Sequence, residues 1–241
     1  MYKKVGLFSF VSGFAVALTL SFILPKDDNL RIQAERLPQA FQILGRQCYT
    51  LCYDGRNKGP LWVYERLKID SLKGDASRNG MRFKEDIDIP VSFRSSLKDY
   101  KNTGFDRGHM CPAGDCPQTF ESMEETFLLS NISPQQPDLN RGLWKALEAR
   151  VRELAKSSEE IHVYTGPLYL PKNASDGKRY VKYQVIGKND VAVPTHFYKM
   201  VRIGEGSLAY IIPNTKIELS DLQGFEVPIE KLEKLTGFKF P

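Results

Sequence analysis

Asp106-Arg107-Gly108-His109 is the stretch that most decides the fold and the chemistry expected of this chain. Further along, Leu129-Ser130-Asn131-Ile132 and Asp138-Leu139-Asn140 lead into a segment with helical character. A histidine can take a proton from water near neutral pH, and an arginine matches the geometry of phosphate. Asparagine oxygens suit a hard cation such as Mg²⁺, which keeps most of its waters. Together these residues predict metal-assisted cleavage of a phosphodiester.

The segment from Asp138 to about Ser157 is predicted to be a helix with Asn140 near the middle of its apolar stripe. At roughly 100° per residue, five apolar side chains fall within about 60° of Asn140: Leu143, Trp144, Leu147, Val151 and Leu154. Glu148 lies about 80° round, at the edge of the stripe. A buried amide without partners costs about 1–3 kcal/mol. A hydrated cation would satisfy Asn140 and Glu148 together. Asn140 taken alone is better explained as a structural residue bonded to a neighbouring loop, but residues 106–109 upstream favour the cation.

Length and charge fit one domain that binds a polyanion. The chain has 241 residues, and setting aside the first 28 leaves roughly 210, enough for a single sizeable core. Lys and Arg number 34 against 29 Asp and Glu. A mildly basic surface is compatible with a nucleic acid, although many basic surfaces bind nothing in particular.

The N-terminus predicts export. Residues 5–24 carry no charge, a run long enough to cross a bilayer as a helix. Residues 1–28 are therefore expected to be a signal peptide or a membrane anchor, formed by an N-terminal hydrophobic helix. The two lysines before this run would keep the N-terminus cytoplasmic. The domain would then be periplasmic or otherwise extracytoplasmic, either secreted or held at the membrane by an uncleaved segment.

Four cysteines are consistent with an oxidising compartment. Two local disulfides, Cys48 with Cys52 and Cys111 with Cys116, are the simplest of the three possible arrangements. A four-cysteine zinc site is an alternative. A nucleophilic Cys111 beside His109 is another, but no other residue of the loop resembles acyl-transfer machinery.

The rest of the chain predicts a strand-rich α+β domain. Residues 29–46 have mostly helical composition, interrupted at Pro38, and are expected to be a lead-in helix or linker before a domain at 47–241. Aromatic and β-branched content predicts five strands: Leu61 to Tyr64, Ile161 to Thr165, Tyr180 to Ile186, His196 to Val201 and Leu208 to Ile212. Ile229, Leu232 and Leu235 have helical spacing, and Gly237 supplies a stop.

Three ordered motifs carry a resemblance to a known family. They are residues 106–113 (DRGHMCPA), 129–135 (LSNISPQ) and 139–144 (LNRGLW). The chain resembles the DNA/RNA non-specific endonuclease family, which has the ββα-metal fold, over roughly Tyr49 to Phe240. The resemblance implies a central antiparallel sheet flanked by helices, with a short strand pair and a metal-bearing helix at the active site. It also implies DNA and RNA as partners, with homodimers common among relatives.

The resemblance assigns the main catalytic roles. His109 matches the general base that activates water, and Asn140 matches the one direct protein ligand of Mg²⁺, for which Mn²⁺ is the alternative. Glu148 matches the acidic residue that holds metal-bound waters. The implied products carry 5′-phosphate and 3′-hydroxyl ends.

Three further positions follow from the same motifs. Asn131 matches the residue that lines the site beside the histidine, and Arg107 matches the motif arginine. Arg78 matches a distant arginine that faces the scissile phosphate, and Asp106 is expected to be structural, fixing the loop or the arginine of the site. The alternative hypothesis is a non-catalytic nucleic-acid-binding surface protein built on the same scaffold.

Overall fold

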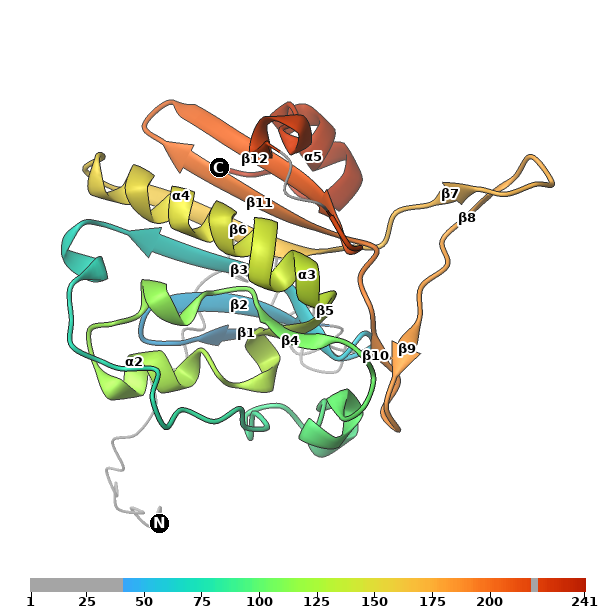
Figure 1. Ribbon diagram of the computed structural model, residues 1–241, viewed down its shortest axis with the longest axis horizontal. Coiled ribbons are helices and arrows are strands. Elements are labelled where there is room, and N and C mark those ends of the chain that lie inside the picture. The colour runs from blue at the N-terminus through green and yellow to red at the C-terminus, as the bar shows by residue number, and fades with distance from the viewer. Residues whose placement is uncertain (1–40, 218–220) are drawn as a thin grey trace, which may run out of the picture. The chain divides into compact units, whose positions relative to one another are not determined.

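A six-stranded antiparallel sheet forms the centre of the computed structural model, which describes residues 41–217 and 221–241 (Figure 1). The strand order is β1-β2-β3-β6-β11-β12, and every neighbouring pair is antiparallel. The six strands are β1 (Phe41–Gly45), β2 (Tyr49–Asp54), β3 (Gly59–Leu67), β6 (Ile161–Leu168), β11 (His196–Ile203) and β12 (Gly206–Pro213). The predicted α+β class with a central antiparallel sheet is confirmed.

The remaining strands form three two-stranded pairs outside this sheet. They are β4 (Asp106–His109) with β5 (Ile132–Gln135), β7 (Lys172–Asn173) with β8 (Arg179–Tyr180), and β9 (Val185–Ile186) with β10 (Val191–Ala192). The α-helices are α2 (Phe120–Glu125), α3 (Pro137–Leu139), α4 (Lys145–Lys156) and α5 (Ile229–Thr236), and a π-helical turn, Asn140–Trp144, joins α3 to α4. Short 3-10 helices lie at Asp70–Leu72, Val91–Phe93, Leu97–Tyr100, Ala113–Asp115, Leu129–Asn131 and Leu222–Phe225.

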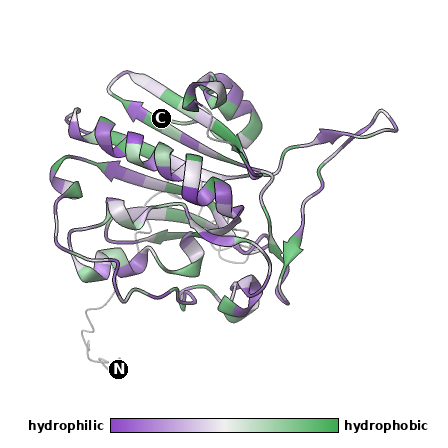
Figure 2. Cartoon of the chain, viewed as in Figure 1, coloured by the Kyte–Doolittle hydropathy of each residue, from purple (hydrophilic) through white to green (hydrophobic). Residues whose placement is uncertain are grey.

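Alternation along β11 gives the sheet two apolar faces. Phe197 and Val201 pack in one cluster with the inner side of α4, whereas Tyr198 and Met200 pack with Leu232 of α5. Successive side chains of a strand point to opposite faces, so one strand serves both layers. Figure 2 shows hydrophobic and hydrophilic residues alternating along α4 and α5, as amphipathic surface helices require.

The start of the domain differs from the expectation. The expected signal or anchor at residues 1–28 lies outside the described residues, as do residues 29–40. Residues 41–45 form strand β1, which pairs with β2 from Phe41↔Asp54 to Gly45↔Thr50. The lead-in helix or linker expected at residues 29–46 is therefore not helical at residues 41–45, because pairing with β2 overrides local helical propensity.

Two C-terminal predictions had opposite outcomes. Residues 180–186 are not one strand: β8 ends at Tyr180 and β9 begins at Val185, with exposed, irregular chain between them. Figure 1 shows β7 and β8 in a hairpin that projects from the body. The helix with Leu232 at its buried centre is confirmed as α5, and it ends at Gly237 in the left-handed conformation (φ 74°).

The residues between β3 and β6 form one excursion from the sheet. The chain leaves β3 at Leu67 and returns at Ile161, and these two residues are direct partners in the sheet. The β4–β5 hairpin and the α3–α4 helix both lie within this excursion. The sheet thus supports a segment that contains every predicted site residue.

Candidate active site

The β4–β5 hairpin holds the central motif. Asp106 pairs with Gln135 and His109 with Ile132 at its two ends. A Cβ on Gly108 would lie 2.2 Å from the buried Gln135 Oε1, so only glycine lets Gln135 pack against the strand at this point. The glycine of the motif is therefore a packing requirement of the hairpin.

Asn131 holds the chain that follows His109. Its Oδ1 accepts a hydrogen bond from the Cys111 backbone N–H (2.9 Å), and its Nδ2 donates to the carbonyls of Cys111 and Thr126 (2.9 Å each). Its side chain is 0% exposed and does not line the cleft described below. The expectation that Asn131 lines the site is wrong, because all its hydrogen-bonding capacity is used within the loop.

His109 lies at the end of β4 among aromatic rings. The imidazole is only 9% exposed and sits 5.3 Å from the Phe83 ring and 4.9 Å from the Phe127 ring, centroid to centroid. Burial, together with the nearby Arg78 guanidinium, lowers the pKa of His109 to about 3. The imidazole is therefore neutral at physiological pH, which is the form that accepts a proton.

The two predicted arginines lie over the same aromatic rings. The Arg78 Cζ is 5.4 Å from the centre of the Phe127 ring, and the Arg107 Cζ is 5.1 Å from that of Phe83. Cation–π contacts of this kind hold a guanidinium in place while leaving its N–H groups for other partners. The aromatic rings thus position His109 and both arginines relative to one another.

The helix begins directly after β5. Pro137 occupies its first turn, and the Gln136 side chain accepts a hydrogen bond from the Leu139 N–H (2.8 Å), which is a favourable start for a helix. The π-helical turn follows at Asn140–Trp144, with Gly142 in a non-helical conformation inside it. A π-turn holds an extra residue, so the 100° spacing assumed from Asn140 does not hold across this point.

As a result, Asn140 lies beside the apolar stripe instead of at its middle. The fully or nearly fully buried positions of the helix are Leu139, Leu143, Trp144, Leu147, Val151 and Ala155, whereas Asn140 is half-buried. Its Nδ2 donates to Asp106 Oδ2 (2.8 Å). A carboxylate only accepts hydrogen bonds, so Asp106 fixes which end of the amide faces it and leaves Asn140 Oδ1 without a partner among the described residues.

Asp106 also binds Arg141. The guanidinium donates two hydrogen bonds to its two carboxylate oxygens, at 2.8 and 2.6 Å. Burial alone would raise the pKa of Asp106, but the bonds from Arg141 and Asn140 outweigh it and hold the pKa below its usual range. Asp106 has a structural role, but its partners are Arg141 and Asn140, whereas the expectation was the loop or the arginine of the motif.

Glu148 lies one to two turns further along the helix. Burial raises its pKa to about 7; the Lys199 ammonium opposes this shift, and the Asp115 carboxyl adds to it. The carboxyl makes no hydrogen bond or ion pair with the described residues. It is a desolvated acid that a cation would stabilise.

One cleft of about 910 Å³ joins these elements. It brings together five of the six predicted site residues: Arg78, Arg107, His109, Asn140 and Glu148. Three further basic residues line it, Arg141, Lys145 and Arg152, and sequence reasoning missed them. Lys145 and Arg152 could have been found from their spacing of three and four residues from Glu148 on the same helix, because such residues share a face. Arg141 lies in the π-helical turn, so regular spacing gave no signal for it.

The cysteines are paired differently from the local arrangement expected. A disulfide joins Cys48 to Cys116, and Cys52 and Cys111 are free. Cys52 lies within β2, where four residues span about 13 Å of extended chain, beyond the reach of a disulfide between Cα atoms. Neither local pair forms, and Cys52 is not part of the cluster of the other three sulfurs.

Comparison with known proteins identifies the class of this fold and site. Residues 31–241 match the family model described as DNA/RNA non-specific endonuclease. The chain therefore belongs to the DNA/RNA non-specific endonuclease family, whose members are metal-dependent nucleic-acid hydrolases.

Particular relatives are similar over most of the chain. Human mitochondrial endonuclease G is 44% identical over 210 residues, covering 85% of this chain and 71% of that protein. Nuclease C1 of Cunninghamella echinulata is 45% identical over 210 residues, covering 83% of each. A solved structure of the EndoG/EndoGI complex, which concerns the mechanism of EndoG inhibition, matches with a TM-score of 0.80 and 41% identity over 85% of this chain and 87% of that one.

These names contradict the expected export of the protein. Endonuclease G of human and cattle, and human EXOG, are named as mitochondrial nucleases. The uncharged N-terminal run had been interpreted from its length and flanking charges alone, and neither property distinguishes an export signal from other N-terminal segments. Within residues 41–217 and 221–241, none of the helices has the length and apolar character needed to cross a membrane.

Proposed function

We propose that this protein is a Mg²⁺-dependent endonuclease that hydrolyses both DNA and RNA, with Mn²⁺ able to replace Mg²⁺. His109 is the general base, and Asn140 is the direct metal ligand. The products carry 5′-phosphate and 3′-hydroxyl ends. The observation that carries the proposal is the single cleft shared by a neutral, buried imidazole and an amide whose oxygen is left without a partner.

The donor set fits a hard divalent cation. Asn140 offers an amide oxygen whose orientation Asp106 fixes, and Glu148 offers a carboxyl that burial destabilises as an anion. Oxygen donors, few in number and supplemented by water, are what Mg²⁺ takes in nuclease-like sites. Asn140 would hold the ion directly, with Glu148 binding its waters. The ion would supply Lewis-acid polarisation of the phosphate.

His109 and the arginines act on the substrate itself. The neutral imidazole takes the proton of the attacking water as the bond to phosphorus forms. Arg107 and Arg78 offer paired N–H groups to the phosphate oxygens. They bind the phosphate and counter the negative charge that grows on it in the transition state.

The further basic residues of the cleft fit the binding of both nucleic acids. Arg141, Lys145 and Arg152 would contact the sugar-phosphate backbone, and contacts of this type position a nucleic acid without identifying its bases. Little sequence preference is therefore expected.

A plasmid-nicking assay tests the proposal. The wild type should relax and linearise supercoiled plasmid with Mg²⁺ present and should be inactive in EDTA. His109→Ala should lose about 10²–10⁴-fold in cleavage rate, as expected for removal of a general base. Its circular dichroism spectrum should match that of the wild type, which excludes unfolding as the cause.

The same assay separates the alternative of a non-catalytic nucleic-acid-binding protein. Such a protein would retard plasmid in a gel without cutting it, with or without metal. Full cleavage by His109→Ala would instead remove His109 from the mechanism.

A further inference from the structure

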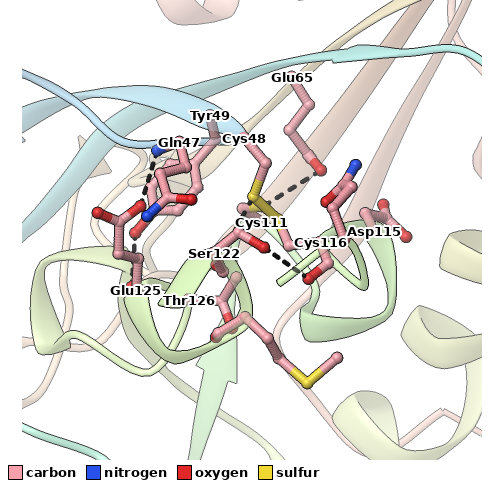
Figure 3. Close-up of a disulfide and its surroundings, with 12 residues drawn as sticks. Gln47, Cys48, Tyr49, Glu65, Cys111, Asp115, Cys116, Ser122, Glu125 and Thr126 are labelled. Atoms are coloured by element: carbon pink, nitrogen blue, oxygen red, sulfur yellow. Dashed lines mark hydrogen bonds between the residues drawn. A yellow bond between two sulfur atoms is a disulfide. The ribbon is translucent and has the colours of Figure 1, made fainter. Parts of the chain in front are cut away.

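The sulfur atoms of Cys48, Cys111 and Cys116 lie close together (Figure 3). Cys48 precedes β2, and Cys111 and Cys116 lie on the loop that follows β4. Besides the Cys48–Cys116 disulfide, the free Cys111 Sγ lies 3.6 Å from Cys116 Sγ. All three sulfurs lie within 4.8 Å of one another, although 68 residues separate Cys48 from Cys116.

A buried carboxyl group lies against one of the three sulfurs. Glu65 of β3 is 1% exposed, and its Oε2 accepts a hydrogen bond from the Cys111 thiol at 3.3 Å. Its other oxygen, Oε1, is buried without a hydrogen-bond partner among the described residues. A carboxyl group buried in this way is costly. Burial raises the pKa of Glu65 well above its usual range; the neighbouring Asp115 carboxyl adds to this shift, and the Lys199 ammonium offsets part of it. The proposed nuclease reaction does not explain why a carboxyl group is buried at this position, because Glu65 does not line the cleft.

The spacing of these atoms fits tetrahedral coordination. Zinc binds thiolate at about 2.3 Å and carboxylate at about 2.0–2.2 Å, so two sulfurs on one ion lie roughly 3.8 Å apart. The Cys111–Cys116 sulfur distance is 3.6 Å, and the Cys111–Glu65 distance is 3.3 Å. The Cys48 and Cys116 sulfurs are too close for this, because they are bonded to each other, and Glu65 meets only the Cys111 sulfur at such a distance. Once the bond is reduced, the Cys48 and Cys116 sulfurs must move apart around the Cys111–Glu65 pair.

We propose that, once the Cys48–Cys116 bond is reduced, Cys48, Cys111, Cys116 and Glu65 bind one Zn²⁺ ion. The disulfide and the metal site then exclude each other, because both use the sulfurs of Cys48 and Cys116. This site is distinct from the hard-cation site at Asn140, since it offers three soft sulfur donors.

A dithiol reductant opens the site in two balanced steps. Its first thiolate attacks Cys48 Sγ, which belongs to a half-buried residue, forming a mixed disulfide and releasing the Cys116 thiolate. Its second thiolate then displaces Cys48 and closes the reductant into its own disulfide. The reductant loses two electrons, and the two cysteines gain them with two protons, which zinc replaces on binding.

An ion held here would stiffen the loop beside His109. Cys111 follows His109 by two residues, and Asn131 already holds its backbone on both sides. Pro112, Ala113 and Gly114 lie between two of the proposed ligands and line the cleft. The metal would therefore preserve in the reduced protein the connection that the disulfide makes in the oxidised one.

Cobalt titration of the full chain tests the proposal. Protein reduced with dithiothreitol and desalted under nitrogen should bind one equivalent of Co²⁺ with the intense thiolate charge-transfer and tetrahedral d–d absorption of a sulfur-rich site. Zn²⁺ should displace the Co²⁺ and bleach both bands. Oxidised protein should give neither band.

Variants locate the site. Cys111→Ser and Glu65→Gln should each weaken Co²⁺ binding at least tenfold. Cys52→Ser is the matched control, because Cys52 is also free and buried but lies outside the cluster, and it should bind as the wild type does. Asn140→Ala should also keep the bands, which separates this site from the proposed nuclease metal and from any failure of that proposal.

A measurement without variants guards against misfolded mutants. Zn²⁺ should raise the Tm of the reduced wild type and leave that of the oxidised protein unchanged. Absence of thiolate bands in folded, reduced wild type would overturn the proposal, as would bands that persist undiminished in folded Cys111→Ser.

Discussion

The hairpin half and the helix half of the candidate site are built in opposite ways. On the hairpin side, His109 and Asn131 are buried, and the Asn131 amide forms its hydrogen bonds with the backbone of Cys111 and Thr126. On the helix side, Asn140 and Glu148 border the cleft, and one bond to Asp106 orients Asn140. The comparison indicates that the hairpin supplies rigidity to the site. The helix supplies the oxygen atoms of Asn140 and Glu148, which are available to a metal ion.

The largest expected effect is on the helix side. Asn140→Ala should reduce Mg²⁺-dependent cleavage by at least about 100-fold, at the upper end of the losses seen for groups that only support a metal ligand. Its free energy of unfolding should change by less than about 1 kcal/mol, since one partly exposed hydrogen bond is lost. Plasmid cleavage against Mg²⁺ concentration, together with urea unfolding, measures both. A variant that cleaves normally would show that the helix does not bind the metal.

The second prediction concerns Asn131. Asn131→Ala leaves a buried N–H and two buried carbonyls without partners, so it should lower the free energy of unfolding by about 2–3 kcal/mol. Urea denaturation gives this value, and isothermal titration with Mg²⁺ should give a Kd for the folded variant close to that of the wild type. If stability were unchanged and the Kd rose instead, the contrast between the two halves would be wrong.

The third prediction concerns the contact that joins the halves. Asp106→Ala frees the Asn140 amide to rotate, so Mg²⁺ affinity should fall about tenfold, the lower end of the effect of outer ligands. Asp138→Ala is the control, because that exposed carboxylate bonds only to the Gln136 side chain. The Kd for Mg²⁺ of each variant decides the matter, and equal losses would exclude an orienting role for Asp106.

The most gradual effect is the pH dependence of stability that His109 confers. Its pKa is about 3 in the folded protein and ordinary, about 6.5, in the unfolded chain. Below about pH 6.5 His109 therefore binds a proton in the unfolded chain but not in the folded protein. The free energy of unfolding falls as the pH falls toward about 3. The slope due to this residue is at most about 1.4 kcal/mol per pH unit. Urea unfolding in EDTA at several pH values should show this slope in the wild type and not in His109→Gln.

Parts of the local structure were predictable because they depend on short stretches of sequence. The four residues ending at His109, the helix after Asp138 and the stop at Gly237 each follow from neighbouring residues, and the structure has all three elements. The chemical roles of His109 and Asn140 remain predictions.

What the sequence could not reveal depends on partners far along the chain. Strand β1 exists because β2 pairs with it, and Cys116 finds Cys48 only once the sheet is formed. The burial of Asn131 depends on the Thr126 and Cys111 carbonyls, which no periodicity reports. The π-helical turn at Asn140–Trp144 changes the direction of Asn140 relative to the apolar stripe. A prediction that assumes a constant 100° per residue cannot include such a turn.

Because Leu67 and Ile161 are paired neighbours, residues 68–160 leave and rejoin the sheet across a gap of about 5 Å. The catalytic segment is therefore a cassette whose two ends can be joined to the matching strands of another member of the family. Cys48 must travel with it, because this cysteine alone anchors the cassette covalently to the first hairpin. A chimera with another family member should therefore be joined at Leu67 and Ile161 and should keep Cys48 together with Cys116.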